Sequence, residues 1–217
     1  MIKPYTVYGA PGSGSVPIEA ALTLIGAPYE VVGDDIVRPV AYNPAANALN
    51  PLNQVPVLVL PTGAIMTESA AMLIYLADQH PAAKLAPAPG DRRRSDFLRW
   101  MSYVSTAIYG LAWIRADPMR LVADAAQIPI IQDRIAERRA DCWRHMDAQI
   151  NPGAFLLGET LSVIDLYVAT VSRWSPRRSR FYVEAPRMAS IVRRVDGDSR
   201  LASFWSARFP FANGWEG

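Results

Sequence analysis

Residues 53–79 read NQVPVLVLPTGAIMTESAAMLIYLADQ, and this stretch contains the most informative local pattern of the chain. The apolar run at 57–60 predicts a strand, and the Pro-Thr-Gly sequence at 61–63 predicts the turn that ends it. We expect a short partner strand at 64–66, because two apolar runs joined by turn residues are typical of an antiparallel pair. A helix is predicted to follow, from a cap at Thr67 to about residue 79. Its inner face is expected to consist of Met72, Leu73, Leu76 and Ala77.

The residues before this stretch predict a β-α-β unit. Short strands are expected at 6–8 and 29–32, and Gly26 is placed to end the helix between them. The helix itself is predicted by apolar residues at helical spacing, which are Ile18, Ala21, Leu22 and Ile25. Residues 33–50 are expected to be irregular, with one short helix. The order β-α-β, loop, β-β-α predicts a thioredoxin-like α/β domain.

The remainder of the chain has a different pattern. Residues 81–90 carry three prolines and no apolar period, which predicts a linker. Beyond it only helical patterns occur, and the predicted helices span 91–116, 124–150, 162–175 and 185–196, followed by an aromatic tail. We therefore predict a first domain at 1–80, a linker at 81–90 and an all-helical domain at 91–217.

One helix start in the second half is strongly specified. Ser162 is a predicted cap, and Asp165 can reach back to it while Leu161 packs on Leu166, which together make a capping box with a hydrophobic staple. This device nucleates a helix and has no chemical role. The arginine clusters at 92–94 and 177–180 are expected on solvated faces or in dimer contacts.

Composition limits the classes of function. The chain has 217 residues, of which 51% are hydrophobic, and a net charge of +2, so we expect no nucleic-acid partner and no attraction to anionic membranes. The single cysteine, Cys142, rules out an intramolecular disulfide. No apolar run is long enough to span a bilayer, and no secretory leader is evident. A cytoplasmic location is the resulting expectation.

Polar residues gather in three segments that are expected to meet. The first is the turn after the first strand, Tyr8 to Ser15, whose hydroxyls come just before a helix. The second is the bend at 53–56 before a strand, and the third is Thr67-Glu68-Ser69 at the start of another helix. Unpaired N–H groups and the dipole at a helix start favour negative charge.

The pattern Gln-Val-Pro, followed about a dozen residues later by Thr-Glu-Ser-Ala-Ala opening a helix, resembles the glutathione-binding half of the glutathione transferases. The spacing from Pro56 to Glu68 is similar to that of the family, and the capping box and the ending at 209–215 also resemble bacterial members. The resemblance covers nearly the whole chain. It implies a thioredoxin-like N-terminal domain, an all-helical C-terminal domain and a homodimer that uses glutathione in detoxification.

The resemblance also implies how glutathione would bind. Pro56 would be a cis proline, which leaves the backbone of Val55 free to pair with the cysteinyl part of the tripeptide. Ser69 would receive the γ-glutamyl carboxylate through its hydroxyl and main-chain N–H. Glu68 would balance the ammonium group, and Gln54 would assist with a hydrogen bond.

The group that keeps the glutathione sulfur ionised is expected in the first turn. A thiolate is a far better nucleophile than a thiol, so a hydrogen-bond donor aimed at the sulfur raises reactivity. Ser13 occupies the place of the catalytic hydroxyl in serine-type members, and Ser15 and Tyr8 are its rivals, with main-chain donors alone as a further alternative. Beta-type members carry a cysteine in this turn, where this chain has Gly14, so a mixed-disulfide mechanism is disfavoured.

The second substrate, a small hydrophobic electrophile, is expected between the domains, with Tyr109 and Trp113 lining its pocket. Isomerase, dehalogenase or peroxidase chemistry at the same site is an alternative, as is a binding or regulatory protein without turnover. An interaction module with an empty cleft and no glutathione affinity is a further one. Cys142 and His145 share one helix, but two ligands do not make a zinc site, so no metal is expected.

Overall fold

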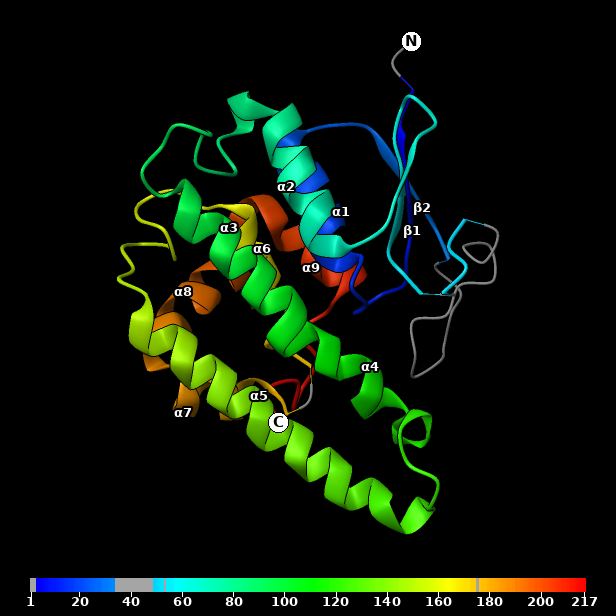
Figure 1. Cartoon of the computed structure of the whole chain (residues 1–217). Helices are drawn as coiled ribbons and strands as arrows, with labels where there is room; N and C mark the ends of the chain where they lie inside the picture. Colours follow the sequence, from blue (N-terminus) through cyan, green and yellow to red (C-terminus); the bar gives the residue numbers. More distant parts are fainter. Residues whose placement is uncertain (1–2, 34–48, 53, 175) are drawn as a thin grey trace.

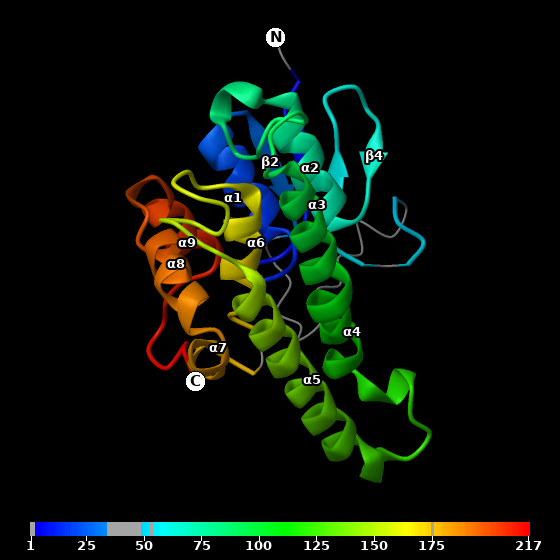
Figure 2. The same ribbon diagram turned by 60° about the vertical axis from the view of Figure 1, so that its left-hand side comes forward.

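The computed structural model describes residues 3–33, 49–52, 54–174 and 176–217 (Figure 1). The predicted short helix within 33–50 falls largely outside the described residues. A small sheet with two helices forms one part of the molecule, and the remaining helices form the other (Figures 1 and 2). Within the described residues, no helix has the length and apolar content needed to cross a lipid bilayer.

The sheet has four strands in the order β2-β1-β3-β4. β1 (Tyr5–Tyr8) pairs in parallel with β2 (Tyr29–Val32), and the crossover between them is the predicted helix. β3 (Val57–Val59) runs antiparallel to β1, and β4 (Ile65–Met66) runs antiparallel to β3. The sequence-based prediction of a β-α-β unit followed by β-β-α is confirmed.

Two helices cover the face of this sheet that is turned toward the helical domain (Figure 1). α1 (Val16–Ile25) ends at Gly26, whose φ of 74° lies in the left-handed region where glycine meets no steric penalty. α2 (Ser69–Gln79) buries all four predicted inner-face residues. Its N-cap position is Glu68, so the prediction of a cap at Thr67 is wrong by one residue.

The helical domain begins with one continuous helical stretch. α3 (Arg94–Tyr103) runs through a π-helical segment, η3 (Val104–Tyr109), into α4 (Gly110–Ala116). The later helices are α5 (Ile128–Gln149), α6 (Val163–Val171), α7 (Arg178–Glu184), α8 (Pro186–Asp196) and α9 (Ala202–Arg208). Short 3₁₀ turns are η2 (Pro81–Ala83), η4 (Pro118–Arg120), η5 (Ala125–Gln127) and η6 (Ser199–Leu201). The sequence prediction missed α7 and α9.

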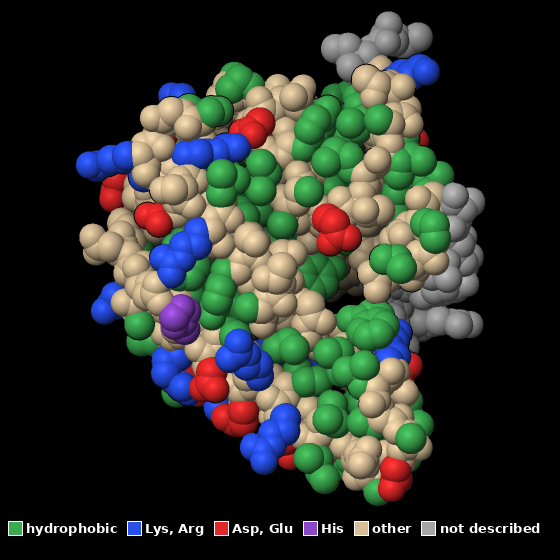
Figure 3. Space-filling view, in the orientation of Figure 1, with side chains coloured by type: hydrophobic (Ala, Val, Ile, Leu, Met, Phe, Trp, Pro, Cys, Tyr) green, Lys and Arg blue, Asp and Glu red, His purple; other side chains and the backbone are tan. Residues whose placement is uncertain are grey.

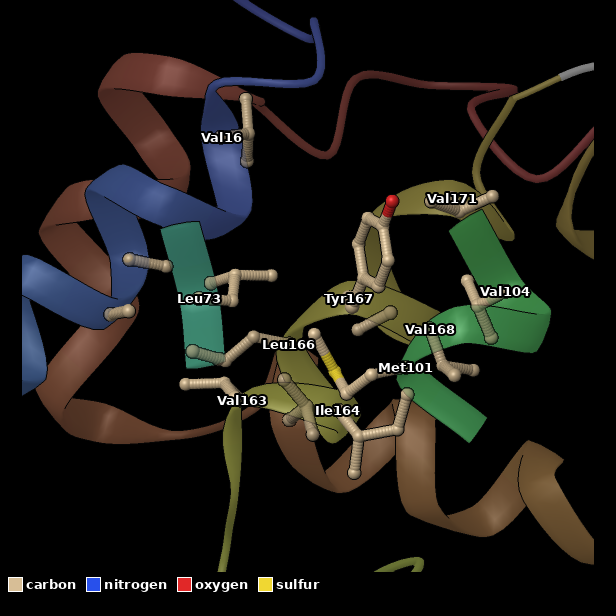
Figure 4. Close-up of a cluster of buried hydrophobic side chains, with 14 of the residues drawn as sticks. Val16, Leu73, Met101, Val104, Val163, Ile164, Leu166, Tyr167, Val168 and Val171 are labelled. Carbon is tan, nitrogen blue, oxygen red and sulfur yellow. The ribbon is translucent and has the colours of Figure 1, made fainter. Parts of the chain in front are cut away.

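α6 is the centre of the core, because every one of its residues is buried. Figure 4 shows Leu73 from α2 close to Leu166 on one side of this helix, with Met101 and Val104 near its other side. The helix starts with the predicted capping box: the backbone N–H and the hydroxyl of Ser162 donate to Oδ2 of Asp165, each at 2.8 Å. The capping box thus fixes the start of α6, the helix that joins the two parts of the molecule.

One expectation about the arginine clusters is wrong. The Arg178 side chain is fully buried, where Nη1 donates to Oδ2 of Asp196 at 2.6 Å and Nη2 donates to the carbonyl oxygen of Ala169 at 2.7 Å. A carboxylate on α8 and the carbonyl oxygen of Ala169 on α6 compensate the desolvation of the guanidinium. By contrast, Arg92 and Arg93 lie at the surface as expected.

Candidate functional site

The first two polar segments lie side by side at one end of the sheet. The β1–β3 ladder ends at the pair Tyr8–Val57, so the turn after β1 and the bend before β3 leave the sheet together. A Cβ atom placed on Gly14 would lie 3.2 Å from Cδ of Pro56, which shows that the two segments are in contact. The structure therefore brings the first two of the three grouped segments together.

The bend before β3 is held by a side chain that the sequence analysis did not identify. The Val55–Pro56 peptide bond is cis, and Val55 lies outside the ladder of paired residues although its side chain is buried. Nδ2 of Asn50 donates to the carbonyl oxygen of Gln54 at 3.0 Å, and the N–H of Leu52 donates to Oδ1 of Asn50 at 3.1 Å. The side chain of Gln54 is left exposed.

The third segment presents an open helix start. Glu68 is exposed and has φ 66° and ψ 99°, a left-handed φ that turns the chain sharply into α2. No side chain caps the first N–H groups of this helix within the described residues. The hydroxyl of Ser69 is buried and shares a hydrogen bond of 2.8 Å with the hydroxyl of Tyr167 on α6. Burial raises the pKa of Tyr167 to about 12, so this anchor stays protonated at neutral pH.

The hydroxyl of Ser13 has three hydrogen-bond partners inside the turn. Its Oγ accepts from the backbone N–H of Ala10 and of Ser15, each at 3.2 Å, and shares a third hydrogen bond of 3.0 Å with Oγ of Ser15. The residue is 8% exposed. Ser13 therefore ties the turn together from within, and its predicted catalytic role stays a prediction.

Ser15 is even more deeply buried, and its hydroxyl donates to Oε1 of Glu19 at 2.6 Å. Glu19 is fully buried in the first turn of α1, where Nε of Arg208 lies 2.5 Å from its Oε2. Arg208 comes from α9, so the C-terminal part of the chain is bonded to the turn. Ser15 occupies the N-cap position without capping the helix through its side chain.

Tyr8 is half-buried and packs against the cluster of Val55 and Val57, so the tyrosine rival lies at the contact of the first segment with the second.

The helical domain reaches this site through Tyr109, the last residue of η3. A Cβ atom placed on Gly14 would lie 1.8 Å from the hydroxyl oxygen of Tyr109. The tyrosine ring lies edge-on to Trp174 and Tyr167, with ring centroids 4.7 Å and 6.1 Å away. Burial, and then the nearby Tyr167 and Glu68, raise the pKa of Tyr109 above its ordinary value of 10.0. The negative group at the start of α2 is thus close enough to influence this phenol.

Trp113 lies one turn further along and is 43% exposed. The guanidinium of Arg120 lies 4.5 Å from its ring centroid. Figure 3 shows a hollow between the start of α2 and α4, with hydrophobic side chains around it. The role of both aromatics in a second-substrate pocket stays a prediction.

Cys142 is buried in α5 and its Sγ lies 3.6 Å from the carbonyl oxygen of Ala107, while His145 is exposed and bonded to Gln149. Among the described residues, no three side chains of His, Cys, Asp or Glu are grouped as metal ligands would be.

Sequence reasoning missed three supports of the site, namely Asn50, Tyr167 and the pair Glu19–Arg208. The acidic residue in the otherwise apolar first turns of α1 is a signal that a partner must exist, since buried carboxylates are normally paired. Nothing in a single sequence identifies that partner, because Arg208 is 189 residues away along the chain. Asn50 and Tyr167 carry no local signal of this kind.

The chain is similar to known proteins in sequence and in fold. The family model described as "Glutathione S-transferase, N-terminal domain" matches residues 15–79. YncG of Escherichia coli K12, described as an uncharacterized GST-like protein, is 32% identical over 196 residues, covering 90% of this chain and 92% of YncG.

Two solved structures confirm the fold predicted from the sequence. A glutathione transferase homologue from Sulfitobacter, solved with bound glutathione, has a TM-score of 0.80 at 24% identity, over 94% of this chain and 97% of that one. BphK, a bacterial GST solved as a ternary complex, has a TM-score of 0.76 at 26% identity, over 94% and 98% of the two chains. With a thioredoxin-like N-terminal domain, a helical C-terminal domain and a relative of this similarity over most of its length, the chain belongs to the glutathione S-transferase family.

Proposed function

We propose that this protein is a glutathione transferase that binds glutathione at the three grouped segments and activates its sulfur for attack on a small hydrophobic electrophile. The observation that carries the proposal is the position of Tyr109, whose hydroxyl lies beside Gly14 and the cis Val55–Pro56 bend while its ring centroid lies 6.1 Å from that of Tyr167. Tyr167 in turn bonds Ser69 at the start of α2, so all three segments are linked through these two tyrosines. The bound glutathione of the Sulfitobacter homologue supports the same ligand here.

Each part of glutathione has a chemically suitable partner. The γ-glutamyl carboxylate fits the N–H groups at the start of α2, which no described side chain caps and where the helix dipole favours an anion. The exposed carboxylate of Glu68 stands beside that position to balance the ammonium group. The backbone of Val55, outside the sheet ladder, is available to pair with the cysteinyl residue, and the exposed Gln54 side chain is available for a further hydrogen bond.

The reaction follows from holding the sulfur as a thiolate. The glutathione thiol loses its proton to water, the sulfur lone pair attacks the electrophilic carbon, and a carbon–sulfur bond forms as the leaving group departs or the π bond opens. A fixed donor beside the sulfur stabilises the anion before attack. The electrophile would occupy the hollow between the start of α2 and α4 (Figure 3), with Tyr109 and Trp113 as its proposed lining. A homodimer in the cytoplasm with a detoxification role completes the proposal.

A second candidate is a glutathione-binding protein without turnover. The saturated hydroxyl of Ser13 favours it, because a group with three partners is not free to face the sulfur. The same site with isomerase, dehalogenase or peroxidase chemistry differs only in the second substrate. A panel of electrophiles, peroxides and isomerisable substrates, assayed with glutathione, separates these outcomes.

Calorimetric titration of glutathione tests the binding site. We expect Ser69→Ala to weaken binding about tenfold, since a hydrogen bond to a charged group contributes roughly 1.5 kcal/mol. Ser206→Ala, an exposed serine on α9, is the matched control and should bind as the wild type does. Thermal unfolding of the free variants separates lost binding from lost folding. Absence of heat with the wild-type protein at millimolar glutathione would refute the proposal.

A further inference from the structure

The donor to the glutathione sulfur can be narrowed to one hydroxyl, an inference that rests on the proposed function. We propose that the hydroxyl of Tyr109, from the helical domain, donates the hydrogen bond that stabilises the thiolate, in place of a serine of the β1–α1 turn.

The hydroxyl protons of Ser13 and Ser15 are both already used in hydrogen bonds within the turn. The hydroxyl of Ser15 lies 2.6 Å from Oε1 of Glu19, a distance typical of a donated bond to a carboxylate. Because that proton is committed, the 3.0 Å bond between the two serines must be donated by Ser13. Oγ of Ser13 also accepts two N–H groups, so its donor and both lone pairs are used. A bond from Ser13 to sulfur would have to break this network.

The hydroxyl of Tyr109, in contrast to the serine hydroxyls, is available as a hydrogen-bond donor. Its hydroxyl makes no hydrogen bond to the described part of the chain, although the ring is packed between Trp174 and Tyr167. The hydroxyl oxygen occupies the space that a side chain at Gly14 would fill, because a Cβ there would lie 1.8 Å from it. The same Cβ would lie 3.2 Å from Cδ of Pro56. An unpaired donor therefore stands between the two segments that flank the cysteinyl residue of glutathione.

The local structure explains how a second-domain residue reaches this point. Tyr109 ends the π-helical segment η3, and a π-helical turn shifts side-chain directions relative to the α-helix on either side. Nε1 of Trp174 donates to the carbonyl oxygen of Gly12 at 2.8 Å. This bond fixes Trp174, which packs edge-on against the Tyr109 ring, to the turn after β1. The absence of a side chain at Gly14 is what lets the phenol approach.

The phenol is in the correct state to act as a donor. Burial, together with Tyr167 and the carboxylate of Glu68, raises the pKa of Tyr109, so the hydroxyl keeps its proton at neutral pH. It cannot serve as the base, and the thiol proton leaves to water. The carboxylate of Glu68 repels the thiolate and so disfavours ionisation of the glutathione thiol. A fixed hydrogen-bond donor at the sulfur offsets this repulsion.

The test is an ultraviolet titration of the thiolate of bound glutathione, with binding measured in parallel by calorimetry. Tyr109→Phe should raise the pKa of the bound thiol by about one unit, the effect of one good hydrogen bond, while the dissociation constant changes less than about threefold. Gly14→Ala should produce the same rise with the tyrosine still present, because its Cβ displaces the hydroxyl. Tyr103→Phe is the matched control, since the Tyr103 hydroxyl donates to the carbonyl oxygen of Cys142 at 3.2 Å.

The outcomes separate this inference from the proposed function. Wild-type protein that binds no glutathione refutes the proposed function. Binding with a thiol pKa that is unchanged in both Tyr109→Phe and Gly14→Ala overturns the inference and leaves the binding site intact. A thiol pKa that rises in Ser13→Ala but not in Tyr109→Phe also overturns it, as does loss of binding in Tyr109→Phe.

Discussion

Replacing Arg208 by methionine removes one half of the buried ion pair that ties α9 to the start of α1. Nε of Arg208 lies 2.5 Å from Oε2 of Glu19, and Nη2 lies 3.2 Å from Oε1. The side chain of Glu19 is 0% exposed and that of Arg208 is 12% exposed. The substitution therefore leaves a carboxylate without its counter-charge where water does not reach it.

The expected loss of stability follows from this burial. Removing one partner of a buried ion pair typically lowers the free energy of unfolding by about 3–5 kcal/mol. The hydroxyl of Ser15 still donates to Glu19 in the variant, so we expect a value near the lower limit. The double variant Glu19→Met, Arg208→Met should recover most of the loss, because apolar side chains of similar size need no counter-charge.

Urea unfolding of the single and double variants measures both values. Arg200→Met is the matched control, because Arg200 pairs with Asp198 at the surface with its own side chain 60% exposed. Such pairs contribute less than about 1 kcal/mol. The reasoning is refuted if Arg208→Met unfolds within about 1 kcal/mol of the wild type, or if the double variant is no more stable than the single one.

Four further outcomes are expected in the same unfolding assay. Ser162→Ala should lower stability by about 1 kcal/mol through loss of the capping box, and an unchanged midpoint would contradict this. Leu166→Ala should lower it by about 2–5 kcal/mol, because a fully buried side chain leaves a cavity. Gly26→Ala should lower it by about 1 kcal/mol, since φ is 74°. Burial raises the pKa of Asp165 from 3.8 to about 6, so the folded protein holds this proton more tightly than the unfolded chain. The contribution of Asp165 to the free energy of unfolding is present below about pH 4 and is lost by about pH 6, a change of roughly 3 kcal/mol. Asp165→Asn should abolish this pH dependence.

The parts of the fold that were predicted correctly are those with local signals. The apolar spacing of α1 and the glycine at its end specify a helix and its stop within a few residues of sequence. Ser162 and Asp165 specify a helix start in the same way. α7 and α9 were missed because each is only seven residues long, too short for a periodic pattern to stand out. The domain boundaries at 81–90 stay a prediction.

The candidate site was only partly predictable for a related reason. Val55, Pro56, Glu68 and Ser69 follow a motif with fixed spacing, so the sequence alone groups them. The burial of Arg178 depends on Asp196 and Ala169, which only tertiary contacts bring to it. The engagement of the Ser13 hydroxyl depends on how the turn folds the N–H groups of Ala10 and Ser15 onto it, and no residue pattern specifies that.

The contacts that hold the site cross from the helical domain to the thioredoxin-like one. Ser69 is anchored by Tyr167, the carbonyl oxygen of Gly12 accepts from Trp174, and the N–H of Gly12 donates to the carbonyl oxygen of Arg208 at 2.9 Å. These bonds fix the helix start and the turn from outside the sheet that carries them. The segments proposed to bind glutathione therefore owe their geometry to residues that follow them by about 100 to 200 positions in the sequence. A site assembled in this way is complete only when the helical domain has packed, so glutathione affinity and the docking of that domain should rise and fall together.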